Sequence, residues 1–125
     1  MSAEGTLDID GSTLVKAQQC VPAAGHQIVI AYANAFVETG LHSSDLGLAE
    51  LEVSFFDSED CTGQRSGYFE TPTSPGSGKW TTIHAGGVPG AATKSIAVAL
   101  AGLKAYRAEK LDICFDNVML KTKAL

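Results

Sequence analysis

The chain has 125 residues, of which 45 % are apolar and 18 % charged, and its formal net charge is −5. This length and composition predict one folded domain spanning residues 1–125 and exclude a disordered tail, because the apolar residues suffice for a single hydrophobic core. The nine basic residues are scattered along the chain, which argues against nucleic acid as a partner, since phosphate binding needs a dense basic patch. No apolar run is long enough for membrane insertion, and no signal-peptide pattern opens the chain.

Turn signals rich in Gly, Pro and Asp recur at short intervals, and apolar residues alternate between them. This spacing predicts an all-β antiparallel sandwich or barrel rather than alternating strands and helices. A helix over 91–107 is the competing interpretation, but its apolar residues alternate and Gly102 interrupts it. The expected strands, in chain order, are 6–9, 13–20, 26–37, 49–57, 66–70, 79–85, 92–101 and 110–121.

The period of two in a strand also assigns side chains to faces. In the fourth expected strand, Leu51 and Phe55 lie on the core face, opposite Glu50 and Glu52 on the solvent face. In the third, both faces are apolar, and Tyr32 is placed on the core face. The expected core between the two sheets consists of Leu51, Val53, Phe55, Ile96, Val98, Ile113 and Phe115.

The last expected strand contains a break in this alternation. Ile113 and Phe115 share one face, whereas Val118 falls out of phase with them by one residue. A β-bulge around Asp116 and Asn117 restores the phase, because a bulge inserts one extra residue on one strand.

The three cysteines, Cys20, Cys61 and Cys114, lack the spacing of a structural zinc site. Their odd number leaves two alternatives open. Either one disulfide and one free thiol form, or all three cysteines are reduced in a cytosolic protein.

Five short motifs follow one another between about residues 5 and 121. They are Gln19-Cys20-Val21-Pro22, Asp60-Cys61-Thr62-Gly63, Gly78-Lys79-Trp80, the run from Pro89 to Leu100, and the run from Phe115 to Leu120. In this order they resemble the motifs of bacterial extracellular carbohydrate-binding modules with a galactose-binding-like jelly-roll fold. The resemblance implies a β-sandwich jelly roll of about eight strands.

The resemblance also implies a disulfide between Cys20 and Cys61, which leaves Cys114 as a free thiol. Such a bridge would stabilise the fold by roughly 3–4 kcal/mol. The modules are usually parts of secreted or surface proteins, so we expect an extracellular or cell-surface domain excised from a multidomain protein. The segment that usually precedes these motifs in the modules, with an extra first strand, is not recognisable here.

The implied function is non-catalytic binding of an oligo- or polysaccharide, in which an aromatic ring stacks on a sugar while carboxylates and amides take its hydroxyls. We expect the contact on the sheet face of Glu50 and Glu52, although the commoner role of such residues is a solvated strand face. For Trp80 a packing role is favoured over binding, and the resemblance places Ala33 where the modules often carry an exposed aromatic residue. The expected binding residues are Glu50, Glu52, Phe56, Tyr68, Phe69 and Tyr106.

Asp116 corresponds to an aspartate that often binds a structural Ca²⁺ ion in related jelly rolls. The plainer interpretation is a bulge residue whose carboxylate accepts local backbone hydrogen bonds. No pair of carboxylates and no Ser/His/Asp set stands out in the sequence as catalytic. An enzyme, such as a small esterase, is therefore the least favoured class. The alternative to a sugar-binding module is a structural or adhesive β-sandwich domain of a surface protein with no sugar site.

Overall fold

The computed structural model describes residues 13–23, 27–39, 47–73, 78–104 and 111–125. These residues form seven strands, so the all-β class is confirmed, and the expected strand 6–9 lies outside them. Nowhere in the described ranges is there a helix that could span a membrane. The strands are β1 (Thr13–Pro22), β2 (Gln27–Thr39), β3 (Gly47–Phe56), β4 (Arg65–Pro72), β5 (Trp80–Gly87), β6 (Ser95–Lys104) and β7 (Leu111–Ala124).

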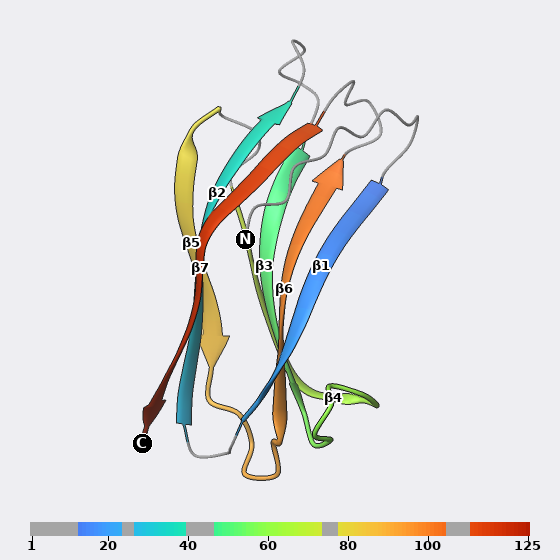
Figure 1. Cartoon of the computed structure of the whole chain (residues 1–125), viewed down its shortest axis with the longest axis vertical. Helices are drawn as coiled ribbons and strands as arrows, with labels where there is room; N and C mark the ends of the chain where they lie inside the picture. Colours follow the sequence, from blue (N-terminus) through green and yellow to red (C-terminus); the bar gives the residue numbers. More distant parts are fainter. Residues whose placement is uncertain (1–12, 24–26, 40–46, 74–77, 105–110) are drawn as a thin grey trace.

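The strands form two antiparallel sheets that face each other in a sandwich (Figure 1). Sheet A has four strands in the order β1-β6-β3-β4, and sheet B has three in the order β5-β2-β7. Each sheet interleaves strands that are distant in the sequence, so most contacts within it are long-range. The helix considered over 91–107 is wrong in its described part, because β6 pairs along its whole length with both β1 and β3.

The core lies between the sheets, where alternate side chains point inward from both layers. Leu51, Val53 and Phe55 of β3 are fully buried there, together with Ile96 of β6. The expected core is confirmed except for Val98, which is only half-buried. The other buried members of this cluster are Val29, Ala31, Ala33, Ala35, Val37, Ala49, Ile83, Ala85, Leu100, Ile113 and Phe115.

The face assigned to Tyr32 in β2 is wrong. Val29, Ala31 and Ala33 point into the core, whereas Tyr32 lies on the outer face of sheet B. The inward set is small, and it faces large side chains such as Phe55 across the interlayer space. Large and small residues interdigitate in this way in well-packed cores.

The bulge expected near the end of the chain is confirmed. The pairing of β2 with β7 shifts register between Tyr32 and Asn34, and Asn117 has a positive φ of 50°. Asparagine tolerates this left-handed conformation better than most residues because its short side chain can hydrogen-bond locally. The shift keeps Phe115 on the inner face and lets Leu120 pack against the same core.

Candidate functional site

The outer face of sheet A carries most of the residues expected to bind sugar, but it does not present them openly. Both Phe56 and Glu52 are only 7 % exposed. The expectation that Phe56 offers an exposed ring is therefore corrected, and Glu52 is no solvated strand residue. On neighbouring β6, Ala97 and Ala99 occupy the same face and are also buried.

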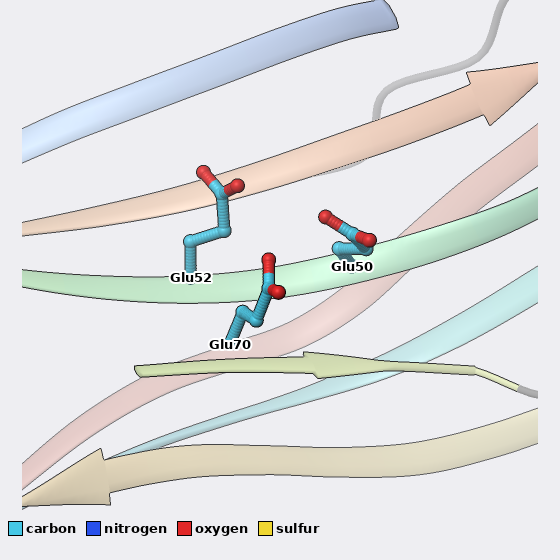
Figure 2. A group of neighbouring side chains, drawn as sticks. All are labelled: Glu50, Glu52 and Glu70. Atoms are coloured by element: carbon cyan, nitrogen blue, oxygen red, sulfur yellow. The ribbon is translucent and has the colours of Figure 1, made fainter. Parts of the chain in front are cut away.

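Three carboxylates, those of Glu50, Glu52 and Glu70, gather on this face between β3 and β4 (Figure 2), and Tyr68 lies beside them. The hydroxyl of Tyr68 lies 2.8 Å from Glu52 Oε1 and 2.8 Å from Glu70 Oε2. A hydroxyl has a single proton, so Tyr68 donates to one of these carboxylates at a time. The Arg65 guanidinium also lies 4.1 Å from the centre of the Tyr68 ring and covers one face of it.

Lys16 of β1 reaches across β6 to this cluster, and its Nζ lies 2.5 Å from Glu52 Oε2. Within the described residues this oxygen has no hydrogen bond of good geometry, so the ion pair is its polar contact. The lysine can span a strand because β6 carries the small side chains of Ala99 and Ala101 between the two partners.

One cation does not balance three carboxylates, and the local pKa values reflect this. Burial raises the pKa of Glu50 above 4.5, and the negative charges of Glu70 and Glu52 raise it further against the opposing effect of Lys16. Burial also raises the pKa of Tyr68, with additional contributions from its hydrogen bonds to Glu70 and Glu52. Glu50 and Tyr68 therefore keep their protons to a higher pH than they would in water.

Oxygen atoms of Glu50, Glu52 and Glu70 lie within 4.8 Å of one another, a spacing compatible with a divalent cation. The Lys16 ammonium already occupies part of that position, so we interpret the group as an internal ion-pair cluster. Asp116 lies on the other sheet, where its Oδ1 accepts a hydrogen bond of 2.9 Å from the backbone N–H of Asn117. Calcium binding at Asp116 stays a prediction.

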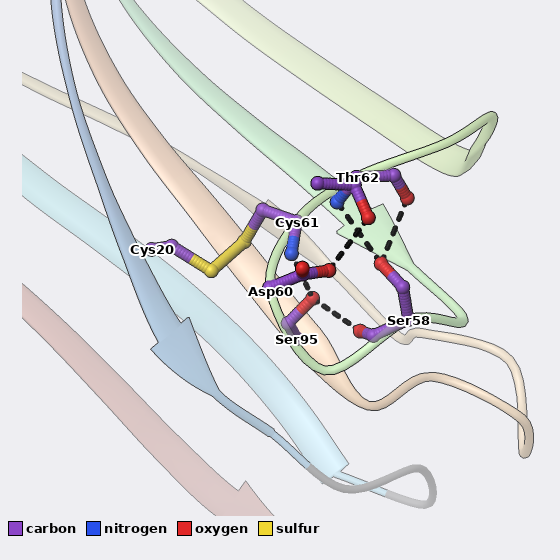
Figure 3. Close-up of a disulfide and its surroundings, with 6 residues drawn as sticks. All are labelled: Cys20, Ser58, Asp60, Cys61, Thr62 and Ser95. Atoms are coloured by element: carbon purple, nitrogen blue, oxygen red, sulfur yellow. Dashed lines mark hydrogen bonds between the residues drawn. A yellow bond between two sulfur atoms is a disulfide. The ribbon is translucent and has the colours of Figure 1, made fainter.

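A disulfide closes one end of the sheet A face (Figure 3). Cys20 of β1 and Cys61 of the β3–β4 loop are bonded, with Cα atoms 6.0 Å apart, so this expectation is confirmed. The backbone N–H of Cys61 donates to Ser95 Oγ at 2.9 Å, and Ser95 Oγ donates to the carbonyl of Ser58 at 2.6 Å. Ser95 is completely buried, and these bonds satisfy its hydroxyl.

Phe69 faces the opposite way from its neighbour Tyr68. Its ring makes an edge-to-face contact with Phe55 at 5.8 Å and covers Gly87 of β5, where a Cβ would lie 2.4 Å from it. Phe69 therefore closes the gap between β4 and β5 and is no part of the sheet A face. Tyr106, the last of the expected binding residues, lies outside the described residues.

The outer face of sheet B presents aromatic side chains far more openly. Trp80 is 55 % exposed, and its ring centre lies 5.7 Å from that of Phe36 on the adjacent strand. Tyr32 and His84 form a second pair, with ring centres 6.0 Å apart. We call these four residues the sheet B platform. Phe36 and Tyr32 are four residues apart on β2, so the two pairs are separated by about 13 Å.

Polar groups lie between the two aromatic pairs. Asn34 is flanked in register by Thr82 on one side and Asp116 on the other, and Thr82 Oγ1 donates to Asn34 Oδ1 at 2.7 Å. This bond leaves the Asn34 amide N–H groups directed away from Thr82 and available as donors. A depression of about 490 Å³ beside the bulge is lined by Asn34, Thr82 and Met119, among others.

One charged side chain covers part of the sheet B platform, at the end where Tyr32 lies. The Nζ of Lys121 lies 5.7 Å from the centre of the Tyr32 ring, a cation–π contact that covers part of that ring. The pair of Trp80 and Phe36 therefore offers the more accessible apolar surface. None of the known protein families compared with the chain matches it, and no curated protein matches it in sequence.

The sequence analysis favoured a packing role for Trp80, although a signal for its exposure was present in the sequence. Ile83 and Ala85 follow it at odd spacing and are the apolar, inward positions of β5. Alternation from them places Trp80, Thr82 and His84 on the outer face.

Proposed function

We propose that this domain is a non-catalytic carbohydrate-binding module of the jelly-roll type that holds its glycan on the outer face of sheet B. The observation that carries the proposal is the pair of the exposed Trp80 and the half-exposed Phe36 beside the polar row of Asn34, Thr82 and Asp116. A tryptophan this exposed is unusual without a ligand, since its apolar surface remains in water. The apolar face of a pyranose removes that surface from water by stacking.

The polar row supplies the groups that a sugar needs at its edge. Asp116 offers acceptor oxygens and Asn34 offers amide donors, and both side chains lie on the same face as the rings. Hydroxyls that donate to Asp116 and accept from Asn34 keep their hydrogen bonds when water leaves. Because the two aromatic pairs are about 13 Å apart, an oligosaccharide contacts both, whereas one pyranose contacts a single pair.

The outer face of sheet A supports binding less well. Its aromatic side chains are occupied, Phe56 by burial and Tyr68 by Arg65 and two carboxylates. The Cys20–Cys61 disulfide is compatible with the extracellular location that such modules have. The open face of sheet B buries only part of a ligand, so the affinity is expected in the micromolar to millimolar range.

The test is calorimetric titration with soluble oligosaccharides and pull-down on insoluble polysaccharides, each with and without Ca²⁺. We expect Trp80→Ala to weaken glycan binding at least about tenfold, equivalent to 1.4 kcal/mol, while the Tm changes little because the ring is largely exposed. Tyr68→Ala, which removes an aromatic ring from the sheet A face, serves as the matched control and retains full affinity.

The outcomes separate the alternatives. Loss of binding in Tyr68→Ala with retention in Trp80→Ala places the glycan on sheet A and contradicts the proposed face. A correctly folded chain that binds none of the glycans contradicts the function itself and favours a structural or adhesive domain of a surface protein.

A further inference from the structure

The depression of about 490 Å³ on the outer face of sheet B lies within the size range of small-molecule sites. Asn34 and Asn117 contribute side-chain amides to its lining, and Tyr32 contributes an aromatic ring. Among the described residues that line it, Lys121 is the only one with a formal charge at neutral pH. The depression therefore carries a positive charge on a chain whose net charge is −5.

The pairing of β2 with β7 explains how Lys121 reaches the depression. Lys121 lies directly opposite Ile30, so its side chain leaves the sheet on the same face as Tyr32, two residues further along β2. The cation–π contact, with Nζ 5.7 Å from the centre of the ring, restrains the ammonium beside Tyr32. The Lys121 side chain is nevertheless exposed, so the ammonium is accessible to a ligand.

The charge of Lys121 is not neutralised by a neighbouring acid. No carboxylate among the described residues forms an ion pair with it. Asp116 pairs with Asn34, which is four positions along β2 from Ile30, the partner of Lys121. This separation is about 13 Å, which exceeds the Debye length of about 8 Å at physiological ionic strength. The Asp116 carboxylate also accepts a hydrogen bond from the backbone N–H of Asn117.

We propose that the depression binds an anionic group of the glycan, a carboxylate or a sulfate, and that Lys121 recognises this group. The inference rests on the proposed function, because it assigns a class of acidic sugar to the same face. One sugar ring stacks on Trp80 and Phe36, and the acidic unit lies at the Tyr32 end of the sheet B platform. There the ammonium donates to the anionic oxygens, and the Asn34 amide donates to a hydroxyl.

A neutral sugar fits this end of the platform less well. Its hydroxyls exchange hydrogen bonds with water for hydrogen bonds with Lys121, whereas an anion gains coulombic attraction in addition. The Tyr32 ring, partly covered by the lysine, offers less surface for stacking than Trp80 does. Charge therefore distinguishes the Tyr32 end of the platform from the Trp80 end.

The test is calorimetric titration of the full chain with two matched pairs of probes at low ionic strength. One pair is an oligogalacturonate and its methyl ester, and the other is a sulfated galactan oligosaccharide and its desulfated form. Each pair keeps the sugar backbone and differs in charge, and the two pairs distinguish a carboxylate from a sulfate. We expect the charged member of at least one pair to bind at least about tenfold more tightly, and this advantage to shrink as NaCl is added.

Three variants assign the effect to Lys121. Lys121→Gln should weaken binding of the preferred charged probe about tenfold, whereas Lys121→Arg keeps the positive charge and should retain most of the affinity. Lys94→Gln is the matched control, because it removes an exposed lysine whose backbone N–H donates to the carbonyl of Phe56 in sheet A. The Tm of all three should stay within about 3 °C of the wild type, since the side chains are exposed.

The outcomes separate this inference from the proposed function. Equal affinities within both pairs, or an unchanged affinity in Lys121→Gln, overturn the inference, and the proposed function stands if Trp80→Ala still weakens binding. An equal loss in Lys94→Gln and Lys121→Gln indicates nonspecific attraction between charges and also overturns the inference. Absence of binding to all four probes and to neutral polysaccharides contradicts the proposed function itself.

Discussion

The two outer faces of the sandwich differ in how far they expose their side chains to solvent. On sheet A the carboxylate of Glu52 and the ring of Phe56 are buried, each 7 % exposed. On sheet B, Trp80 is 55 % exposed although its ring is large and mostly apolar. Exposure on an outer face therefore depends on the neighbours of a residue more than on its own polarity.

The difference originates in the strands next to these residues. The centre of sheet A carries alanines on β6, so the long side chain of Lys16 bends over them and meets Glu52. The β3–β4 loop is drawn onto the same face by the Cys20–Cys61 disulfide. Sheet B has no such cover among the described residues at Trp80. Sheet A covers its own side chains, whereas sheet B leaves the apolar surface of Trp80 exposed.

The largest effect that separates the faces is expected from the disulfide. Replacing both cysteines, Cys20→Ser with Cys61→Ser, removes a bridge between residues 41 positions apart and should lower the free energy of unfolding by about 4 kcal/mol. Chemical denaturation under oxidising conditions measures this, with Cys114→Ser as the control. Glycan titration of the folded double variant should match the wild type. A loss of affinity would show that the two faces are coupled.

A second experiment compares two phenylalanines, one from each face. Phe56→Ala should lower the free energy of unfolding by about 3–5 kcal/mol, because the ring is buried. Phe36→Ala should cost about 1–2 kcal/mol, since the ring is half-exposed, but should remove most of the glycan binding. Denaturation and titration of both variants check this reciprocal pattern. Equal binding losses would contradict the assignment of the site to sheet B.

Much of the fold was predictable because local rules act within single strands. The alternation of Leu51 and Phe55 with glutamates placed β3 correctly, and the phase break before Val118 located the bulge. The Cys20–Cys61 bridge followed from a resemblance of motifs, not from spacing. The strand order in the sheets could not be derived, because it is determined by pairing between distant segments.

The site was harder to predict because burial on an outer face is a property of several strands together. Glu52 is polar in the sequence, yet Lys16, 36 residues earlier, and the alanines of β6 remove it from water. Tyr32 is preceded by apolar residues at both phases of β2, so alternation alone cannot tell inside from outside there. Only the packing of small Ala31 and Ala33 against sheet A decides it.

A smaller effect is expected from the buried carboxylate. Glu52→Ala removes the acceptor of Tyr68 and the partner of Lys16, and should lower the free energy of unfolding by about 1–3 kcal/mol. The value lies below that of a fully buried ion pair because Lys16 is 38 % exposed and can regain water. Lys16→Ala should cost more than Glu52→Ala, because it leaves the buried Glu52 carboxylate without its cation. Urea denaturation measures both, and the reverse order would contradict the burial argument.

The smallest effect concerns the pH dependence of sheet A. Burial and the charges of Glu70 and Glu52 raise the pKa of Glu50 above 4.5 in the folded chain, so the folded state binds this proton more tightly than the unfolded state. As the pH rises from 4.5 through the raised pKa, the proton is lost and the free energy of unfolding decreases.

Glu50→Gln removes this loss, so the variant should exceed the wild type in stability at pH 7. The difference should vanish well below pH 4.5, where Glu50 is protonated in both states. Denaturation of both chains across this range tests it, with Glu59→Gln on the exposed loop as the control. A Glu50→Gln chain less stable than the wild type at pH 7 would mean that the ionised carboxylate is held by Lys16 more strongly than it is repelled by its neighbours.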